Sequence, residues 1–215
     1  MLPQWALDLL RPLVGLLARI LWRARWYNLE YIPKDGGVII ASNHQTYIDP
    51  FWISVPVHRP VRYLAWDAAF SWPIVGAGLR AFGAWPLQLE GTDLTPIRRS
   101  LQWISEGGAV VIFPEGGRGN PDGSLKKFKA GAVRMALEAG VPILPVTIRG
   151  GHQVWPSTYR FPHFGRPVEI IYHPLIRIDQ AAAGGTRECA RRETQKLAQL
   201  IGSALETESA TDEHG

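Results

Sequence analysis

The sequence predicts an α/β fold in which helices flank a mainly parallel central sheet. Short apolar runs recur along the chain, longer amphipathic segments separate them, and Gly or Pro marks most of the boundaries. A parallel strand pair needs a long crossover connection, which is usually a helix. Strands and helices that alternate in this way therefore favour a parallel sheet.

The expected strands are short apolar runs with turn residues beside them. The clearest starts directly after Gly107-Gly108, and the first follows a Pro-Lys-Asp-Gly turn. In chain order they cover residues 37–41, 61–65, 84–89, 109–113, 141–148 and 168–172. Helical spacing predicts one helix from Pro50 onward and further helices over residues 74–82, 94–106, 129–139 and 186–205. Gly140 provides the expected end of the helix over residues 129–139.

Residues 1–26 form an N-terminal segment that is strongly apolar but unsuited to a membrane span. Asp8 and several arginines interrupt it, and its longest uncharged stretch, residues 12–18, falls short of the roughly 20 apolar residues that a span needs. No basic start or small-residue cleavage site marks a signal peptide. Leucines recur at helical spacing and Pro12 interrupts them, which predicts a pair of amphipathic helices lying in the membrane surface. The alternative is a helix packed on the protein's own core.

Charge and cysteine content narrow the partners and the compartment. The formal net charge is +4, although residues 206–215 carry four carboxylates and no Lys or Arg. We expect this acidic tail to be disordered and to follow a single domain over residues 27–205. The basic body favours anionic partners such as a membrane surface, and no RNA-recognition signature or zinc-finger spacing indicates nucleic acid. Cys189 is the single cysteine, which excludes an internal disulfide and favours a reducing compartment.

The segment from Asn43 to Pro50 contains a histidine and an aspartate where a strand ends and a helix begins. A carboxylate can fix the tautomer of a histidine, whose other ring nitrogen then takes a proton from a hydroxyl. The spacing of His44 and Asp49 does not fit one helix face, so they can meet only if His44 lies in a loop. Asp49 before Pro50 also fits a helix N-cap, and His44 alone fits a structural histidine. Catalytic and structural interpretations both stay open at this point.

Two further segments contain residue types that bind phosphorylated ligands. Residues 113–119, Phe-Pro-Glu-Gly-Gly-Arg-Gly, follow the clearest strand at the edge where α/β folds bind ligands. Glycines allow a substrate to approach closely, and Arg118 can hold a phosphate through two hydrogen bonds. Lys129 lies at an expected helix N-terminus, where a bound anion would offset its unfavourable interaction with the helix dipole. A Pro-Gly turn with a solvated arginine, and an exposed lysine, are the structural alternatives.

Together these segments resemble the motif set of the glycerolipid acyltransferases, of the bacterial 1-acylglycerol-3-phosphate acyltransferase type. Four motifs occur in the family's order within residues 27–175: Asn-His-x4-Asp, Phe-Pro-Glu-Gly-x-Arg, Phe-Lys-x-Gly-Ala and Val-Pro-Ile-Leu-Pro-Val. Each motif is weak alone, but their combination in this order is specific.

The resemblance implies direct transfer of a fatty acyl group from acyl-CoA or acyl-carrier protein to the hydroxyl of a lysophospholipid. The expected acceptor is 1-acylglycerol-3-phosphate, which gives phosphatidic acid. His44 would be the base and Asp49 would orient it, without an acyl-enzyme. The acceptor head group would contact Glu115, Gly116, Arg118 and Lys129. The acyl thioester is a co-substrate, no cofactor or metal is expected, and the enzyme would act at the cytoplasmic face of the membrane as a peripheral or monotopic protein.

The sequence departs from the family where an arginine helps to bind the acceptor phosphate. Leu89 occupies the arginine position of the family block Gly-x5-Arg. Arg98 or Arg99 could compensate, or the acceptor could be another lysolipid or amphiphile. Two other functions stay open: a non-catalytic lipid-binding or membrane-remodelling protein on the same fold, and a thioester hydrolase that uses water as acceptor. The intact His44 and Asp49 argue against the first, and a retained acceptor site argues against the second.

Overall fold

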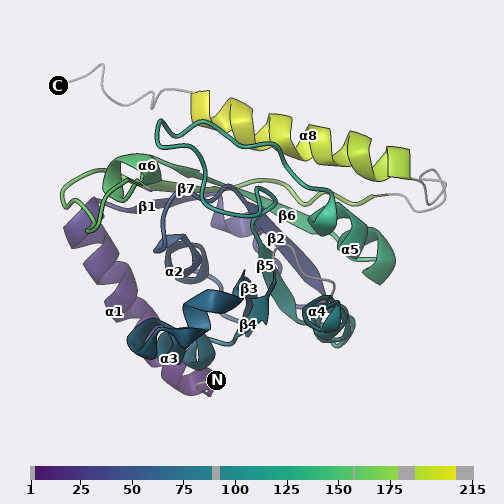
Figure 1. The fold of residues 1–215 in the computed structure, drawn as a ribbon, viewed down its shortest axis with the longest axis horizontal. Helices are drawn as coiled ribbons and strands as arrows, with labels where there is room; N and C mark the ends of the chain where they lie inside the picture. The colour runs from purple at the N-terminus through teal and green to yellow at the C-terminus, as the bar shows by residue number, and fades with distance from the viewer. Residues whose placement is uncertain (1–2, 89–92, 157, 179–186, 207–215) are drawn as a thin grey trace.

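A seven-stranded sheet forms the centre of the fold, and helices cover both of its faces (Figure 1). The computed structural model describes residues 3–88, 93–156, 158–178 and 187–206. The strands are β1 (Arg25–Tyr27), β2 (Val38–Ser42), β3 (Val61–Trp66), β4 (Ala84–Leu87), β5 (Ala109–Ile112), β6 (Ile143–Arg149) and β7 (Glu169–Tyr172). The helices are α1 (Gln4–Trp22), α2 (Asp49–Ser54), α3 (Pro73–Ala81), α4 (Thr95–Ser105), α5 (Gly131–Ala139), α6 (Gly151–Val154) and α8 (Arg187–Glu206), with the 3₁₀ helices η1 (Leu29–Tyr31) and η2 (Asp67–Ser71).

The strands lie in the order β1-β7-β6-β2-β5-β3-β4. Neighbouring strands are parallel except β6 and β7, which run antiparallel. The predicted α/β fold with a mainly parallel sheet is therefore confirmed. Strands β6, β2 and β5 are neighbours in the middle of the sheet, and their carboxyl ends meet at one edge. In sheets of this kind, ligands bind in the loops at that edge.

Residues of β2 alternate between two hydrophobic cores, one on each face of the sheet. Val38 and Ile40 face the core that α1 and α2 complete, in which Trp52 of α2 is fully buried. Ile39 and Ala41 face the opposite core, which contains side chains of α4, α5 and α8. Figure 1 shows these two groups of helices on opposite sides of the sheet. Because β2 is buried on both faces, its sequence is a continuous apolar run rather than an alternating one.

The N-terminal segment forms one helix, α1, so the predicted pair of helices is wrong. Pro12 lies inside α1 and removes a backbone hydrogen-bond donor, which normally kinks or ends a helix. Packing keeps the helix intact, because Arg11, Gly15 and Ala18 are buried on one side of it. A Cβ at Gly15 would lie 3.1 Å from Cγ1 of Val55, so α1 approaches the end of α2 closely. Among the described helices, none is long and apolar enough to cross a membrane.

Several boundaries differ from those that the sequence predicts. No pattern predicts β1, which is three residues long and pairs with β7 at the edge of the sheet. Helix α2 begins one residue earlier than expected, and α5 begins at Gly131, so that Lys129 precedes the helix. Strand β4 ends at Leu87, and Leu89 lies outside the described residues. The tail was predicted over residues 206–215, but Glu206 is the last residue of α8, and residues 207–215 lie outside the described residues.

Candidate active site

His44 lies in the loop that joins β2 to α2, at the edge where the central strands end. We call residues 43–48 the His44 loop. Its first residue, Asn43, is fully buried and pairs with the backbone of Ile148 on β6. Asn43 Nδ2 donates to the Ile148 oxygen at 2.8 Å, and the Ile148 nitrogen donates to Asn43 Oδ1 at 2.7 Å. These two bonds hold the start of the loop against the neighbouring strand.

The side chains of His44 and Asp49 contact each other, as the sequence predicts. His44 Nδ1 lies 2.9 Å from Asp49 Oδ2. Asp49 is fully buried, and it accepts bonds from the backbone nitrogens of Gln45 and Thr46 at 2.6 and 2.8 Å. The Thr46 hydroxyl donates to Asp49 Oδ1 at 2.7 Å. Asp49 therefore stabilises both the turn of the His44 loop and the position of the His44 ring. It makes no side-chain cap for α2.

These contacts determine the tautomer of His44. Asp49 Oδ2 accepts two backbone N–H bonds, so it is also an acceptor toward the ring, and His44 Nδ1 carries the hydrogen. Nε2 then has a free lone pair. The ring stacks on Phe113 with centroids 4.0 Å apart, which fixes its plane, and the side chain is 16% exposed. A histidine arranged in this way can take a proton from a hydroxyl group.

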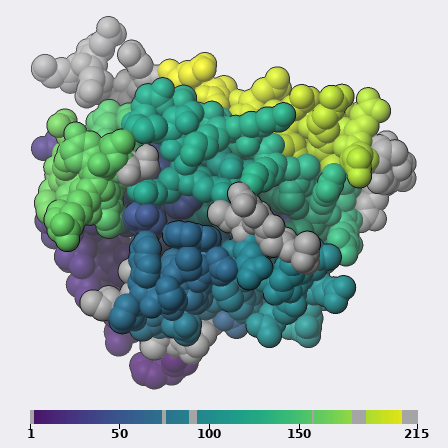
Figure 2. All heavy atoms as spheres, viewed as in Figure 1, coloured from purple at the N-terminus to yellow at the C-terminus, as the bar shows by residue number. Residues whose placement is uncertain are grey.

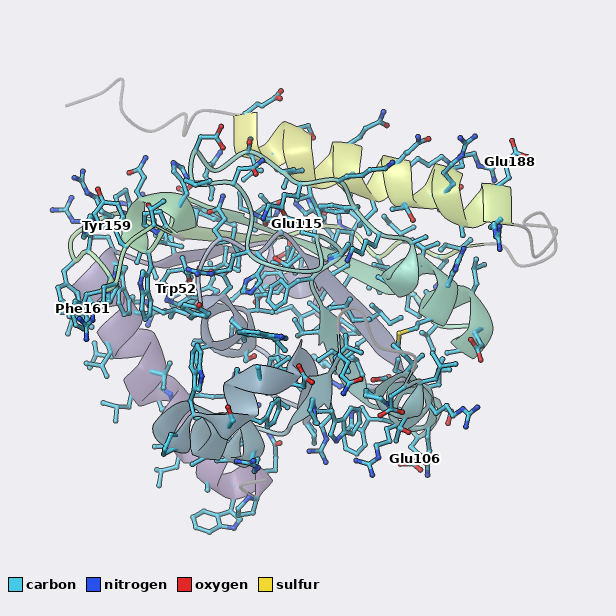
Figure 3. All side chains as sticks on the ribbon, in the orientation of Figure 1. Trp52, Glu106, Glu115, Tyr159, Phe161 and Glu188 are labelled. Atoms are coloured by element: carbon cyan, nitrogen blue, oxygen red, sulfur yellow. The ribbon has the colours of Figure 1, made fainter. Side chains whose placement is uncertain are left out.

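Glu115 lies inside the fold, where Figure 3 labels it. Its carboxylate connects the His44 loop to the segment that precedes α5. Its Oε1 accepts a bond from the His44 backbone nitrogen at 2.7 Å, and its Oε2 accepts one from the Lys126 nitrogen at 2.8 Å. The Gly119 nitrogen also donates to the His44 oxygen at 2.5 Å. Both oxygens of this buried carboxylate are thus occupied by backbone groups. The substrate-binding role of Glu115 stays a prediction, and the geometry favours a positioning role.

Burial raises the pKa of Glu115 above its ordinary value of 4.5, although the hydrogen bonds from Lys126 and His44 act to lower it. A folded-state pKa above the unfolded value means that folding favours the protonated carboxyl. This group therefore contributes stability at low pH, and the contribution is lost as the pH rises from 4.5 through the folded-state pKa.

Glu115→Gln is expected to lower the free energy of unfolding by about 1–3 kcal/mol, because an amide N–H would face a buried backbone N–H. Since Gln does not titrate, the difference from wild type should shrink as the pH rises from 4.5. Urea unfolding at a series of pH values measures this difference. A difference that grows with pH would show that burial does not raise the Glu115 pKa.

Arg118 lies over the ring of Tyr47, with its guanidinium carbon 3.9 Å from the ring centroid. This cation–π contact joins the loop after β5 to the His44 loop. Arg118 Nη1 is buried and has no hydrogen-bond partner among the described residues. A buried unpaired donor is costly, and a guanidinium with a free donor can bind an anion through a charge-assisted hydrogen bond. Arg118, which the sequence predicts as a site residue, therefore lies beside the His44 loop.

Gly116 and Lys129 contact each other across the same site. Gly116 has a φ of +71°, and a Cβ there would lie 2.7 Å from Lys129 Nζ, so a glycine lets the lysine lie across the loop. The Lys129 backbone nitrogen donates to the Pro114 oxygen at 2.8 Å, a loop contact made before α5 begins. Lys126 Nζ donates to the Arg118 oxygen at 2.6 Å. The loop after β5 is therefore surrounded by cationic side chains.

Other residues support the His44 loop through contacts that the sequence does not indicate. Gln45 Nε2 donates to the Gly123 oxygen at 3.3 Å, and Gln45 Oε1 accepts from the His152 nitrogen at 3.1 Å. Tyr47 makes an edge-on contact with Trp155, with centroids 5.3 Å apart. These partners are distant in the sequence, so no local spacing signals them. Within the described ranges, no group of three or more His, Cys, Asp or Glu side chains is placed to hold a metal ion.

Comparison with known proteins identifies the family. The profile of the family described as Acyltransferase matches residues 23–149, which is more than half of the chain and includes His44, Asp49 and the loop after β5. The chain belongs to the acyltransferase family. A 1-acyl-sn-glycerol-3-phosphate acyltransferase from Bacillus subtilis is 30% identical over 72% of this chain and 75% of its own length. The resemblance to glycerolipid acyltransferases is therefore confirmed.

Further relatives of this chain are longer proteins. The chloroplastic 1-acyl-sn-glycerol-3-phosphate acyltransferase LPAT1 of Arabidopsis thaliana is 29% identical over 68% of this chain but only 42% of its own length. The chain spans 38–54% of the plant and algal relatives that it matches. The crystal structure of the 1-acyl-sn-glycerophosphate acyltransferase PlsC from Thermotoga maritima is similar over 95% of this chain and 80% of that chain, with a TM-score of 0.71 and 21% identity. This similarity shows that the two proteins share a fold.

Proposed function

We propose that this acyltransferase moves a fatty acyl group from acyl-CoA or acyl-carrier protein to the free hydroxyl of 1-acylglycerol-3-phosphate, giving phosphatidic acid. The contact between His44 and Asp49 carries the proposal, because it provides a base for the acceptor hydroxyl. The names of relatives, 1-acyl-sn-glycerol-3-phosphate acyltransferases, support the acceptor. The acyl thioester is itself an activated donor, so the reaction needs no further cofactor.

In the proposed reaction, His44 Nε2 takes the proton of the acceptor hydroxyl while the hydroxyl oxygen attacks the thioester carbonyl carbon. The carbon–sulfur bond of the tetrahedral intermediate then breaks, and His44 Nε2 gives this proton to the leaving thiolate sulfur. Asp49, 2.9 Å from Nδ1, stabilises the positive ring while it holds this proton. The acyl group passes directly between the two substrates, and no acyl-enzyme forms.

The cationic loop after β5 supports the binding of the acceptor phosphate. Arg118 has a free donor at Nη1, and Lys129 lies against Gly116 of the same loop. The bond from the Gly119 nitrogen to the His44 oxygen keeps this loop beside the proposed base. With Leu89 at the family's arginine position, we propose that the phosphate depends mainly on these side chains.

Arg118→Ala is expected to raise the KM for 1-acylglycerol-3-phosphate by about 10- to 150-fold. This factor corresponds to the loss of one hydrogen bond to a charged group, about 1.5–3 kcal/mol. The reaction with a monoacylglycerol, which lacks the phosphate, should change little. Steady-state kinetics with both acceptors measure the difference. Arg134→Ala, an exposed arginine on α5, is the matched control. An equal rise in KM for both acceptors would show that Arg118 does not recognise the phosphate.

The rival functions give different products in the same assay. A thioester hydrolase would release free fatty acid at an undiminished rate when no acceptor is present. A lipid-binding protein would release neither fatty acid nor phosphatidic acid. Another lysolipid acceptor would give a faster reaction than 1-acylglycerol-3-phosphate in a panel of lysolipids, with the same dependence on His44.

We also propose that the enzyme acts at the cytoplasmic face of the membrane, attached through α1. One face of this helix packs on the core through Gly15 and Ala18. Its other face exposes apolar side chains: Trp5, Leu9, Leu13, Leu16, Leu17 and Ile20. Such a helix can lie with its apolar face in the lipid head-group region, and the basic body of the protein favours anionic lipids. The two interpretations of this segment, interfacial and core-packed, thus apply to opposite faces of one helix.

A further inference from the structure

The segment before β7, residues 158–167, exposes aromatic side chains at the edge of the molecule. We call it the aromatic loop. Tyr159, Phe161 and Phe164 are 53%, 69% and 63% exposed. Figure 3 shows Tyr159 and Phe161 at the outer edge of the fold, on the side of α1. In Figure 2, the green part of the chain that contains this loop stands directly beside the purple α1. Exposed aromatic residues in a group indicate a binding surface.

The aromatic loop is held on the carboxyl end of α1 by hydrogen bonds and a ring contact. The Gly165 nitrogen donates to the Leu21 oxygen at 2.7 Å, and Trp22 Nε1 donates to the His163 oxygen at 2.9 Å. The rings of Trp22 and Phe164 stack with centroids 6.0 Å apart. The loop therefore has a defined position, and it continues the exposed apolar face of α1 beyond the end of the helix.

The charge around this surface fits an anionic lipid bilayer. Residues 158–167 include Arg160 and Arg166 and no carboxylate. The guanidinium of Arg160 lies 5.5 Å from the ring centroid of Phe161, and Arg19 and Arg23 are exposed near the end of α1. Aromatic rings with adjacent arginines are typical of the membrane interface, where the rings enter the acyl boundary and the cations meet phosphates.

The same loop also reaches the proposed active site. Trp155 Nε1 donates to the backbone carbonyl oxygen of Tyr159 at 3.1 Å, and the Trp155 ring contacts Tyr47 of the His44 loop. Tyr47 in turn lies under Arg118. A short chain of contacts thus joins the exposed aromatic residues to the side chains that would hold the acceptor.

We propose that the aromatic loop is a second membrane-contacting element, which inserts Tyr159 and Phe161 into an anionic phospholipid surface beside α1. This proposal rests on the proposed function, because it assigns to the loop the task of presenting the active site to lipid-embedded acceptors. Two contacts on different elements fix the orientation of a protein on a surface, whereas one helix alone leaves it free to rotate about the helix axis. The aromatic loop and α1 together therefore determine which side of the protein faces the bilayer.

A fluorophore that responds to polarity tests the insertion directly. Cys189→Ala removes the single native cysteine, and Phe161→Cys then allows labelling of the full-length protein on the loop. Gln102→Cys, on the exposed side of α4, is the matched control. We expect a blue shift of the emission at position 161, and none at position 102, when vesicles of phosphatidylcholine and phosphatidylglycerol are added without an acyl donor.

Phe161→Ser should weaken vesicle binding about tenfold, because the transfer of one aromatic side chain from water into the membrane no longer contributes to binding. Phe161→Trp should preserve binding. Acylation of vesicle-embedded 1-acylglycerol-3-phosphate should fall by a similar factor, while a water-soluble short-chain acceptor reacts as with wild type. The double variant Leu13→Ser, Ile20→Ser in α1 is the positive control for reduced binding.

Three results would overturn the proposal. The first is the absence of a blue shift at position 161 on vesicles to which the protein binds, which would leave attachment through α1 intact. The second is vesicle binding by Phe161→Ser equal to that of wild type. The third is a shift that depends on protein concentration without vesicles, which would indicate a contact between copies of the chain. Failure of the proposed reaction is detected separately, because wild type would then leave the short-chain acceptor unchanged.

Discussion

His44→Ala is expected to lower kcat by roughly 10²- to 10⁴-fold, the usual contribution of a general base. His44 Nδ1 contacts Asp49 Oδ2 at 2.9 Å, so Nε2 is the ring nitrogen that can take the proton of the acceptor hydroxyl. Without Nε2, the acceptor hydroxyl has to attack before it loses its proton. Transfer of labelled acyl groups to 1-acylglycerol-3-phosphate measures the loss.

The loss should be chemical and not structural. The backbone of His44 keeps its bonds to Glu115 and Gly119 in the variant, so vesicle binding and the unfolding transition should change little. His58→Ala, at an exposed histidine after α2, is the matched control and should retain activity. Added imidazole should restore part of the rate of His44→Ala. Full activity of this variant would disprove the proposed mechanism.

Asp49→Asn and Asp49→Ala should both lower kcat by roughly 10²- to 10⁴-fold, but they should differ in stability. Both remove the negative charge that stabilises the protonated ring of His44. Asn keeps an oxygen for the backbone nitrogens of Gln45 and Thr46, and its amide can donate to the Thr46 hydroxyl. Ala leaves these buried groups unpaired, at a cost of about 1–3 kcal/mol for each.

Chemical unfolding of the two variants separates the roles of the carboxylate. We expect Asp49→Ala to lose about 3 kcal/mol or more relative to Asp49→Asn, with both nearly inactive. An active and stable Asp49→Ala protein would show that this residue neither orients His44 nor holds the loop. An inactive but equally stable Asp49→Ala would show that the loop has other support.

The middle of the sheet was predictable because β2, β5 and β6 are buried on both faces. Such strands are continuous apolar runs. All six expected runs overlap an observed strand, and in chain order they correspond to β2, β3, β4, β5, β6 and β7. Strand β1 has no such signal, because Arg25–Tyr27 is a short edge strand with two exposed residues. The order of strands and the antiparallel direction of β7 depend on long-range pairing, which periodicity does not report. Pro12 misled the prediction for α1, since packing on the core offset the missing hydrogen bond.

The candidate site was predictable where one short motif contains both partners. His44 and Asp49 lie in one loop and the helix start that follows it, so their contact could be anticipated. The carboxylate of Glu115 could not be placed, because its two partners are backbone nitrogens of residues elsewhere in the chain. The contact of Arg118 with Tyr47 likewise joins two loops that only the folded sheet brings together.

Direct transfer is tested most simply by mixing purified protein with labelled acyl-CoA, and separately with labelled acyl-carrier protein, in the presence and absence of 1-acylglycerol-3-phosphate. Labelled phosphatidic acid and the intact mass of the protein are then measured. We predict that phosphatidic acid forms only with the acceptor, and that the protein gains no acyl group in its absence. A labelled acyl-protein, or thioester hydrolysis that is as fast without the acceptor as with it, would contradict direct transfer by His44.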